Sequence, residues 1–280
     1  MNDSRGSRLE PIAVSDQSTV VAEFEPSEVR ETAYQSEAAL EAEMIALLQS
    51  QAYEYLPITS EAELTWNLRK QLELLNGIQF SDSEWERFFS ESIAGKRDGI
   101  VEKTVRIQED HVQVLRRDDG TTKNITLLDK TNIHKNRLQV INQYEVGAQE
   151  SGEDTGGRHA NRYDVTILVN GLPLVHVELK RRGVDIREAF NQIDRYQRDS
   201  FWAGSGLFEY VQLFVISNGT LTKYYSNTTR NAHVDEQKKR RSGKKTSNSF
   251  EFTSWWTDAQ NNAIQDLPSF VKTFFAKHTL

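Results

Sequence analysis

The segment YDVTILVNGLPLVHVELKR, residues 163–181, decides the fold of this chain. Residues 163–170 and 174–180 are rich in β-branched and apolar side chains, which is typical of strands. Gly171 and Pro173 supply the break between them, because glycine tolerates a positive φ and proline cannot donate to a ladder. We therefore expect two antiparallel strands joined by a tight turn.

Three charged residues stand out on this apolar hairpin. Asp164 begins the first strand, while Glu178 and Lys180 lie two residues apart near the end of the second, on one face. The start of one hairpin strand lies beside the end of the other, so the three side chains should meet. Two carboxylates repel each other unless a cation lies between them. The pattern predicts a site for a hard divalent cation such as Mg²⁺; the alternative is an edge strand with a surface Glu–Lys pair.

The hairpin resembles the active-site region of the PD-(D/E)xK nuclease superfamily, with Asp164, Glu178 and Lys180 as the Asp…Glu-x-Lys triad. The resemblance is closest to the R (restriction) subunit of type I restriction–modification enzymes. The motifs that carry it are NRYDV at 161–165, VELK at 177–180 and Gln-x-x-x-Tyr at 192–196. It extends from about residue 34 to the C terminus. Tyr163 stands where the family has a proline, a departure that does not touch the chemistry.

The resemblance implies an α/β fold with a PD-(D/E)xK restriction-endonuclease-like core. Its mixed central sheet would be flanked by helices, with N-terminal helical and β additions. It also implies Mg²⁺-dependent hydrolysis of DNA phosphodiester bonds, with Mn²⁺ able to substitute. Asp164, Glu178 and the backbone carbonyl of Leu179 would hold the metal, and Lys180 would assist the attacking water.

A glutamate on the helix before the sheet commonly reaches toward the metal in this superfamily. The first helix is expected near residues 37–51, where Leu40 and Met44 have helical spacing. Glu41 is the preferred candidate because it borders this apolar stripe, and Glu37, one turn earlier, is the alternative. Otherwise both are solvent-facing glutamates, which the helix dipole favours in a first turn.

Another helix, expected after the hairpin at residues 185–199, carries the residues that the family uses to engage or position DNA. Gln192 and Tyr196 are four residues apart and so share a face. Arg195 and, on the loop before Asp164, Arg162 are candidate phosphate contacts. The alternative is that Tyr196 packs in the core while Gln192 and the arginines are solvated.

The remaining segments predict further elements of the sheet and its helical cover. Expected helices are 61–75 and one that opens with the capping box 81–84, and expected strands are 104–107 with 112–115 as a small hairpin, 137–146, 210–217 and 221–225. The crossover through the helix at 185–199 should be right-handed, which makes strands 174–180 and 210–217 parallel.

Composition restricts the function classes. The formal charge is −7, so any contact with DNA must come from a local basic patch. The basic run at 238–245 could neutralise phosphates or belong to a disordered loop. Cysteine is absent, which excludes disulfides and Cys-based zinc sites. No apolar run approaches the length of a membrane span and no signal peptide is evident, so we expect a cytoplasmic protein.

The expected organisation is a flexible arm at 1–33, an endonuclease domain at 34–257 and, at 258–280, the start of a linker to a motor domain. The unfinished helical pattern at the end favours a fragment of a longer R subunit. No Walker A loop occurs, so ATP would act only through the absent motor domains. Implied partners are double-stranded DNA and the methyltransferase (M) and specificity (S) subunits. The alternatives are a stand-alone repair or recombination nuclease and an inactive DNA-binding or docking module.

Overall fold

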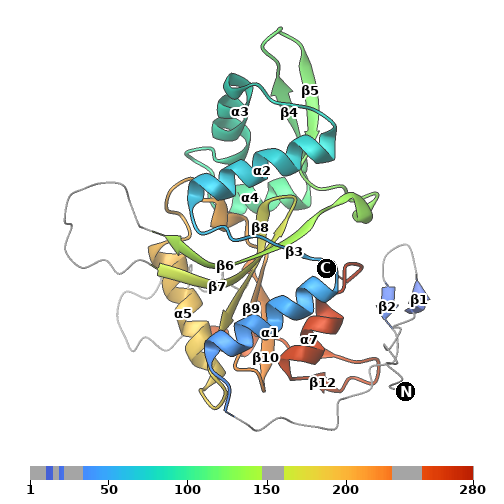
Figure 1. Cartoon of the computed structure of the whole chain (residues 1–280), viewed down its shortest axis with the longest axis vertical. Helices are drawn as coiled ribbons and strands as arrows, with labels where there is room; N and C mark the ends of the chain where they lie inside the picture. Colours follow the sequence, from blue (N-terminus) through green and yellow to red (C-terminus); the bar gives the residue numbers. More distant parts are fainter. Residues whose placement is uncertain (1–10, 15–18, 22–33, 147–160, 229–247, 280) are drawn as a thin grey trace, which may run out of the picture.

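The computed structural model describes residues 11–14, 19–21, 34–146, 161–228 and 248–279 (Figure 1). The strands are β1 (Pro11–Val14), β2 (Thr19–Val21), β3 (Glu54–Tyr55), β4 (Val112–Arg116), β5 (Thr122–Thr126), β6 (Leu138–Val146), β7 (Asn161–Val169), β8 (Leu172–Leu179), β9 (Leu213–Ser217), β10 (Thr222–Ser226), β11 (Trp256–Thr257) and β12 (Ala263–Ile264). The α-helices are α1 (Glu37–Ser50), α2 (Glu61–Asn76), α3 (Asp82–Phe88), α4 (Ile100–Gln108), α5 (Ile186–Asp199) and α7 (Leu267–Phe274).

The centre of the molecule is a mixed six-stranded sheet in the order β10-β9-β8-β7-β6-β3. The pairs β6–β7, β7–β8 and β9–β10 are antiparallel, and the pairs β8–β9 and β3–β6 are parallel. This confirms the predicted hairpin and the predicted parallel crossover through α5. The apolar hairpin β7–β8 lies between β6 and β9, and so in the interior of the sheet.

The turn between β7 and β8 consists of Asn170 and Gly171, both with positive φ (51° and 83°). Two such residues match the right-handed twist of the strands that they join. A side chain at Gly171 would meet the Cα of Leu68 at 2.6 Å, so α2 packs directly on the turn. Pro173 was expected to lie in this break, but it belongs to β8 and pairs with Leu168 at an irregularity of the ladder. The bulge is what lets a proline enter the strand.

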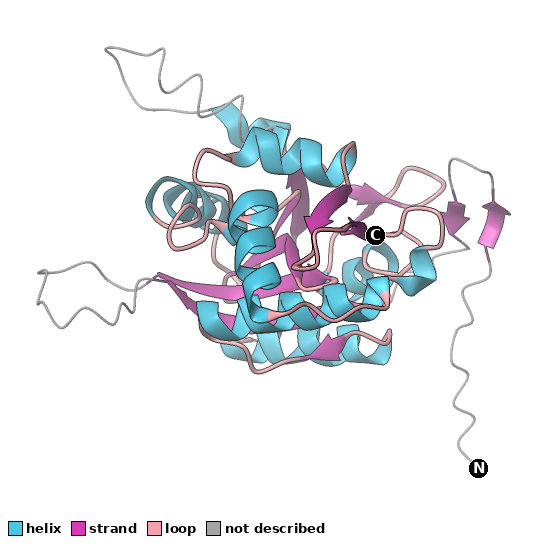
Figure 2. Ribbon diagram, turned by 90° about the horizontal axis from the view of Figure 1, so that it is seen from above, coloured by secondary structure: helices cyan, strands magenta, loops and turns pink. Residues whose placement is uncertain are grey.

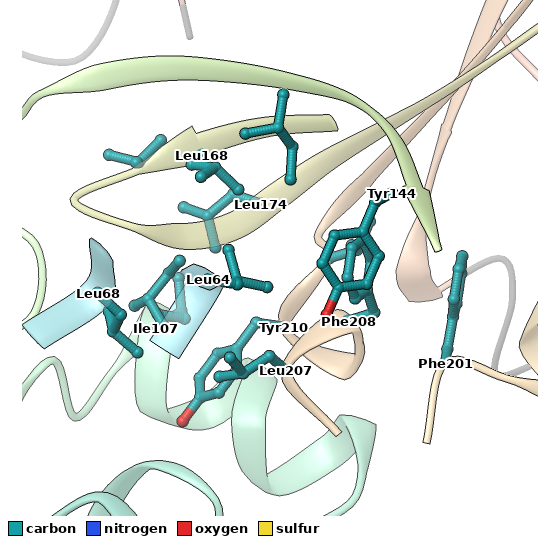
Figure 3. Close-up of a cluster of buried hydrophobic side chains, with 14 of the residues drawn as sticks. Leu64, Leu68, Ile107, Tyr144, Leu168, Leu174, Phe201, Leu207, Phe208 and Tyr210 are labelled. Carbon is teal, nitrogen blue, oxygen red and sulfur yellow. The ribbon is translucent and has the colours of Figure 1, made fainter. Parts of the chain in front are cut away.

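Helices cover both faces of the sheet (Figures 1 and 2). On one face α1 and α7 pack against the strands through Leu40, Met44, Phe270 and Phe274. On the other face α5 and the helical region around α2 and α4 enclose a second core, in which Leu64, Ile107 and Leu168 gather with Tyr144, Phe208 and Tyr210 (Figure 3). The mixed α/β architecture with a helix-flanked sheet is thus as predicted.

The prediction of a small hairpin formed by residues 104–107 and 112–115 is wrong. Residues 104–107 belong to helix α4, whose start is capped by Glu102, which accepts the main-chain N–H of Gly99 at 2.9 Å. The hairpin instead pairs β4 with β5 around the turn at 118–120. Together with α2 and α3 it forms a lobe beyond one end of the sheet (Figure 1).

Several sequence predictions fall outside the described residues. These are most of the arm at 1–33, where only the antiparallel pair β1–β2 is described, and the basic run at 238–245. Among the helices that are described, none combines the length and apolar character needed to cross a bilayer.

Candidate active site

Asp164 lies where strands β7 and β8 part. Their pairing ends at Val165 and Val177, and one residue further Oδ2 of Asp164 accepts the main-chain N–H of Leu179 at 2.8 Å. On the neighbouring strand β6, Gln143 lies opposite Asp164 and has a left-handed backbone (φ 54°). Neither Gln143 nor Asp164 is paired in the β6–β7 ladder. The side chain of Asp164 therefore replaces a main-chain partner and is held against β8.

Glu178 and Lys180 complete a compact charged group with Asp164. Glu178 is fully buried, and its Oε1 accepts a 3.1 Å hydrogen bond from Nζ of Lys180. The same ammonium donates to the carbonyl of Leu179 at 3.1 Å. Lys180 is 9% exposed, so this ion pair is largely withdrawn from solvent. The structure brings together the three side chains that the sequence singled out.

Desolvation raises the pKa of both carboxyl groups, and a neighbouring carboxylate adds to the increase at each: Glu178 for Asp164, and Glu37 for Glu178. Desolvation is the largest cause for Asp164, whose pKa rises to about 7, and the charge of Glu178 adds to the increase. Desolvation also raises the pKa of Glu178 to about 7, against the opposing charge of Lys180. One ammonium does not compensate two carboxylates of which one is buried and the other half-buried, so the site favours an additional positive charge, either a proton or a metal ion.

His176 is a neighbour of this group to which the sequence interpretation gave no role. It precedes Glu178 by two residues on β8, and its Nε2 lies 3.6 Å from Oε2 of Glu178. The ring is fully buried among Tyr163, Tyr196 and Phe201. Desolvation lowers its pKa to about 4, so the imidazole is neutral at physiological pH. The i, i+2 spacing to Glu178 was the available signal, since strand alternation puts both on one face.

The preferred first-helix candidate, Glu41, is buried and bonded to strand β6. Its carboxylate accepts hydrogen bonds from Nδ2 of Asn142 and Nε2 of Gln143. Successive strand residues normally point to opposite faces. Both amides reach one carboxylate here because Gln143 has the left-handed conformation. Glu41 therefore contacts Gln143, the residue of β6 that lies opposite Asp164 of β7.

The alternative candidate, Glu37, is exposed and lies by the end of β8. Its carboxylate accepts the main-chain N–H of Arg181 at 3.3 Å, and its charge contributes to the raised pKa of Glu178. Helix α1 thus brings Glu41 to strand β6 and Glu37 to the end of β8.

The Gln–Tyr pair of α5 braces the strand that carries Asp164. Nε2 of Gln192 donates to the hydroxyl of Tyr196, which donates to the main-chain carbonyl of Arg162 at 2.8 Å. Tyr196 is 2% exposed, so it packs, as the alternative interpretation held. The side chains of Arg162 and Arg195 are exposed, and the Arg195 guanidinium lies 5.7 Å from the centre of the Tyr196 ring. The pair is therefore bonded to the main chain of β7, while the arginines face solvent.

The donor atoms fit a hard cation. Carboxylate and carbonyl oxygens are the ligands that Mg²⁺ prefers, and it usually keeps water or phosphate at its other positions. Oε2 of Glu178 is buried and has no hydrogen-bond partner within the described ranges. No group of three His, Asp or Glu side chains suited to metal binding occurs in those ranges. A metal would therefore rely on Asp164, Glu178 and the Leu179 carbonyl, with solvent or substrate completing its shell.

The chain is similar to known proteins over most of its length. Residues 34–233 match the family model described as the N terminus of the type I restriction enzyme R protein. The EcoprrI endonuclease subunit of Escherichia coli is 47% identical over 96% of this chain and 79% of its own length. The SsaAORF53P and SauMSSORF170P endonuclease subunits of Staphylococcus saprophyticus and Staphylococcus aureus are each 41% identical over 86% of this chain, which spans 23% of their lengths. The chain therefore belongs to the family of type I restriction enzyme R proteins and corresponds to their N-terminal region.

Proposed function

We propose that this chain is the endonuclease part of a type I restriction enzyme R subunit, with a Mg²⁺-dependent PD-(D/E)xK site formed by Asp164, Glu178 and Lys180. The observation that carries the proposal is the pair of carboxylates, Glu178 buried and Asp164 half-buried, at the point where β7 and β8 part, with one lysine bonded to Glu178. Buried carboxyls with raised pKa values in a compact charged group are typical of functional sites. The names of the similar proteins, all endonuclease subunits, support the same reaction.

Each residue has a role that follows from its position. Asp164, Glu178 and the Leu179 carbonyl would hold the metal, and Mn²⁺ could replace Mg²⁺. Bound there, the ion would polarise the scissile phosphodiester and lower the pKa of a bound water. Lys180 would orient the attacking water or offset charge that develops on the phosphate.

The surrounding residues would set the geometry. Glu41 is the preferred additional acidic residue and Glu37 the alternative. Gln192 and Tyr196 would fix the strand that carries Asp164, and the exposed Arg162 and Arg195 would contact DNA phosphates.

In the proposed assembly, the nuclease domain expected at residues 34–257 is joined by α7, which packs against its sheet, and it acts with ATP-driven motor domains of the same subunit. Specificity and methyltransferase subunits would read and modify the site on double-stranded DNA. The nuclease would then cut by backbone geometry rather than by base sequence.

The test is plasmid cleavage by an R subunit that carries this sequence, assembled with M and S subunits, Mg²⁺ and ATP. Asp164→Ala, Glu178→Ala and Lys180→Ala should each abolish cleavage and leave ATP hydrolysis intact. Glu86→Ala, which changes an exposed acidic residue of α3, should have no effect. Cleavage that survives all three site changes would reject the proposal. Cleavage by this chain alone, without ATP or other subunits, would favour a stand-alone nuclease.

A further inference from the structure

His176 lies in a closed aromatic compartment behind Glu178. The imidazole is fully buried, and the rings of Tyr163, Phe201 and Tyr196 meet it edge-on with centroids 5.3, 5.5 and 6.0 Å away. Edge-to-face contacts on several sides fix the plane of the ring. The plane of the imidazole is therefore fixed, and with it the directions in which its ring atoms can point.

The nitrogens of His176 and the carboxylate oxygen that they approach have few neighbours to pair with. Within the described part of the chain, neither ring nitrogen of His176 makes a hydrogen bond and no N–H donor reaches Oε2 of Glu178, whose carboxyl group interacts otherwise with Lys180 and with the carboxyl of Asp164. Nε2 of His176 and Oε2 of Glu178 are 3.6 Å apart, slightly beyond hydrogen-bond length. Buried polar atoms without partners are costly and uncommon, which indicates that these atoms pair in another state of the site.

We propose that His176 is a positioning residue for Glu178, donating a hydrogen bond from Nε2 to Oε2 when the carboxylate takes up a divalent cation. This inference rests on the proposed metal site. Oε1 of Glu178 is already held by Lys180, so a bond at Oε2 would fix both oxygens. Carboxylates that ligate metals are commonly oriented by such hydrogen bonds from residues around them.

The inference also gives Tyr196 a physical link to both carboxylates. Its hydroxyl holds the main-chain carbonyl of Arg162, two residues before Asp164, and its ring packs on His176, two residues before Glu178. Helix α5 would therefore set the spacing of Asp164 and Glu178 through two contacts of one side chain. A small shift of α5 would therefore displace both carboxylates.

The test is Mn²⁺ binding to the 280-residue chain, measured by titration calorimetry, with circular dichroism to verify folding. His176→Phe keeps the aromatic packing and removes the donor, and it should weaken binding about 10- to 100-fold. His176→Gln, whose amide can place an N–H near the position of Nε2, should recover part of the loss. Thr166→Val is the matched control, because Thr166 pairs with His176 across the strands and its buried hydroxyl also makes no hydrogen bond to a described residue. This variant should bind Mn²⁺ like the wild type.

A spectroscopic measurement on the wild-type chain tests the inference even where His176→Phe does not fold. In the wild-type chain with labelled histidine, NMR should show the Nε2–H tautomer of His176. Its proton should move downfield when Mg²⁺ is added, and this response should vanish in Glu178→Gln. The Nδ1–H tautomer, or wild-type Mn²⁺ affinity in His176→Phe, would overturn the positioning role alone. If wild type and Asp164→Ala bind Mn²⁺ equally, the proposed metal site itself fails, and this inference fails with it.

Discussion

The carboxylate of Asp164 accepts a 2.8 Å hydrogen bond from the main-chain N–H of Leu179. The bond joins Asp164, one residue from Val165, to Leu179, two residues from Val177, so a side chain continues the bonding where the ladder stops. Asp164 thus holds two strands together and brings its charge close to Glu178. Asparagine at position 164 can keep the acceptor oxygen, whereas alanine cannot, and this difference separates structural from electrostatic effects.

The metal-free chain should lose stability as the pH rises through this site. Asp164 and Glu178 have pKa values near 7 when folded, above their ordinary values of 3.8 and 4.5. Between about pH 4 and 7 the folded state therefore binds more protons than the unfolded state, so the free energy of unfolding falls with pH. Asp164→Asn removes one charge and should be more stable than wild type at pH 8 by a few kcal/mol, since one pKa unit is worth about 1.4 kcal/mol.

Urea unfolding at a series of pH values measures this difference. The gap between Asp164→Asn and wild type should be small near pH 4 and widen toward pH 8, and comparing the two cancels titrations elsewhere in the chain. Asp118→Asn is a control, because its carboxyl is exposed and its pKa is lowered by hydrogen bonds to Ser81, Ser83 and Arg87. A gap between Asp164→Asn and wild type that does not change with pH would contradict the raised pKa values.

A divalent cation should replace the missing positive charge. Mn²⁺ at about a hundred times its dissociation constant would stabilise the folded chain by about 2.7 kcal/mol, a rise of several degrees in Tm. Protons compete for the same carboxylates, so the rise should be large near pH 8 and small near pH 5. Differential scanning fluorimetry measures it. The rise should be absent in Asp164→Ala and normal in Glu86→Ala; a normal rise in Asp164→Ala would place the ion elsewhere.

The sequence predicted the hairpin and the meeting of Asp164, Glu178 and Lys180 because both follow from local rules. Strand alternation sets which side chains share a face, and a two-residue turn brings the start of one strand to the end of the other. The parallel pairing of β8 with β9 follows from the chirality of the crossover through α5. None of these steps needs information from distant parts of the chain.

Contacts between distant segments explain what the sequence did not predict. Residues 104–107 were predicted as a strand but belong to helix α4, which also contains Lys103. Lys103 is buried, and it is bonded to the carbonyl of Gly206 and to the carboxylate of Glu209, about a hundred residues away. The two amides that hold Glu41 come likewise from β6, and only the folded chain reveals them.

Lys180 should be needed for cutting and dispensable for metal binding. It touches Oε1 of Glu178 and the carbonyl of Leu179, and a bound cation would take over the neutralisation of the carboxylate. Lys180→Met should reduce plasmid cleavage by the assembled enzyme about 10²- to 10⁴-fold, while Mn²⁺ affinity changes only a few-fold. Lys70→Met, which removes a half-exposed lysine paired with Glu73 on α2, is the control. Equal losses of cleavage and Mn²⁺ affinity would mean that Lys180 acts by holding Glu178 in place.

Gly171, in the β7–β8 turn beneath α2, should be more sensitive to substitution than Gly120, in the β4–β5 turn. Gly171 and Gly120 both have φ 83°, but a Cβ at Gly171 would lie 2.6 Å from the Cα of Leu68, whereas at Gly120 nothing lies within 4 Å. Gly120→Ala should therefore cost only the left-handed strain of about 1–2 kcal/mol. Gly171→Ala should cost about 1–3 kcal/mol more, because the clash is with backbone and cannot be relieved by a rotamer change. Urea unfolding of the two variants measures the difference, and equal costs would show that α2 moves freely away from the turn.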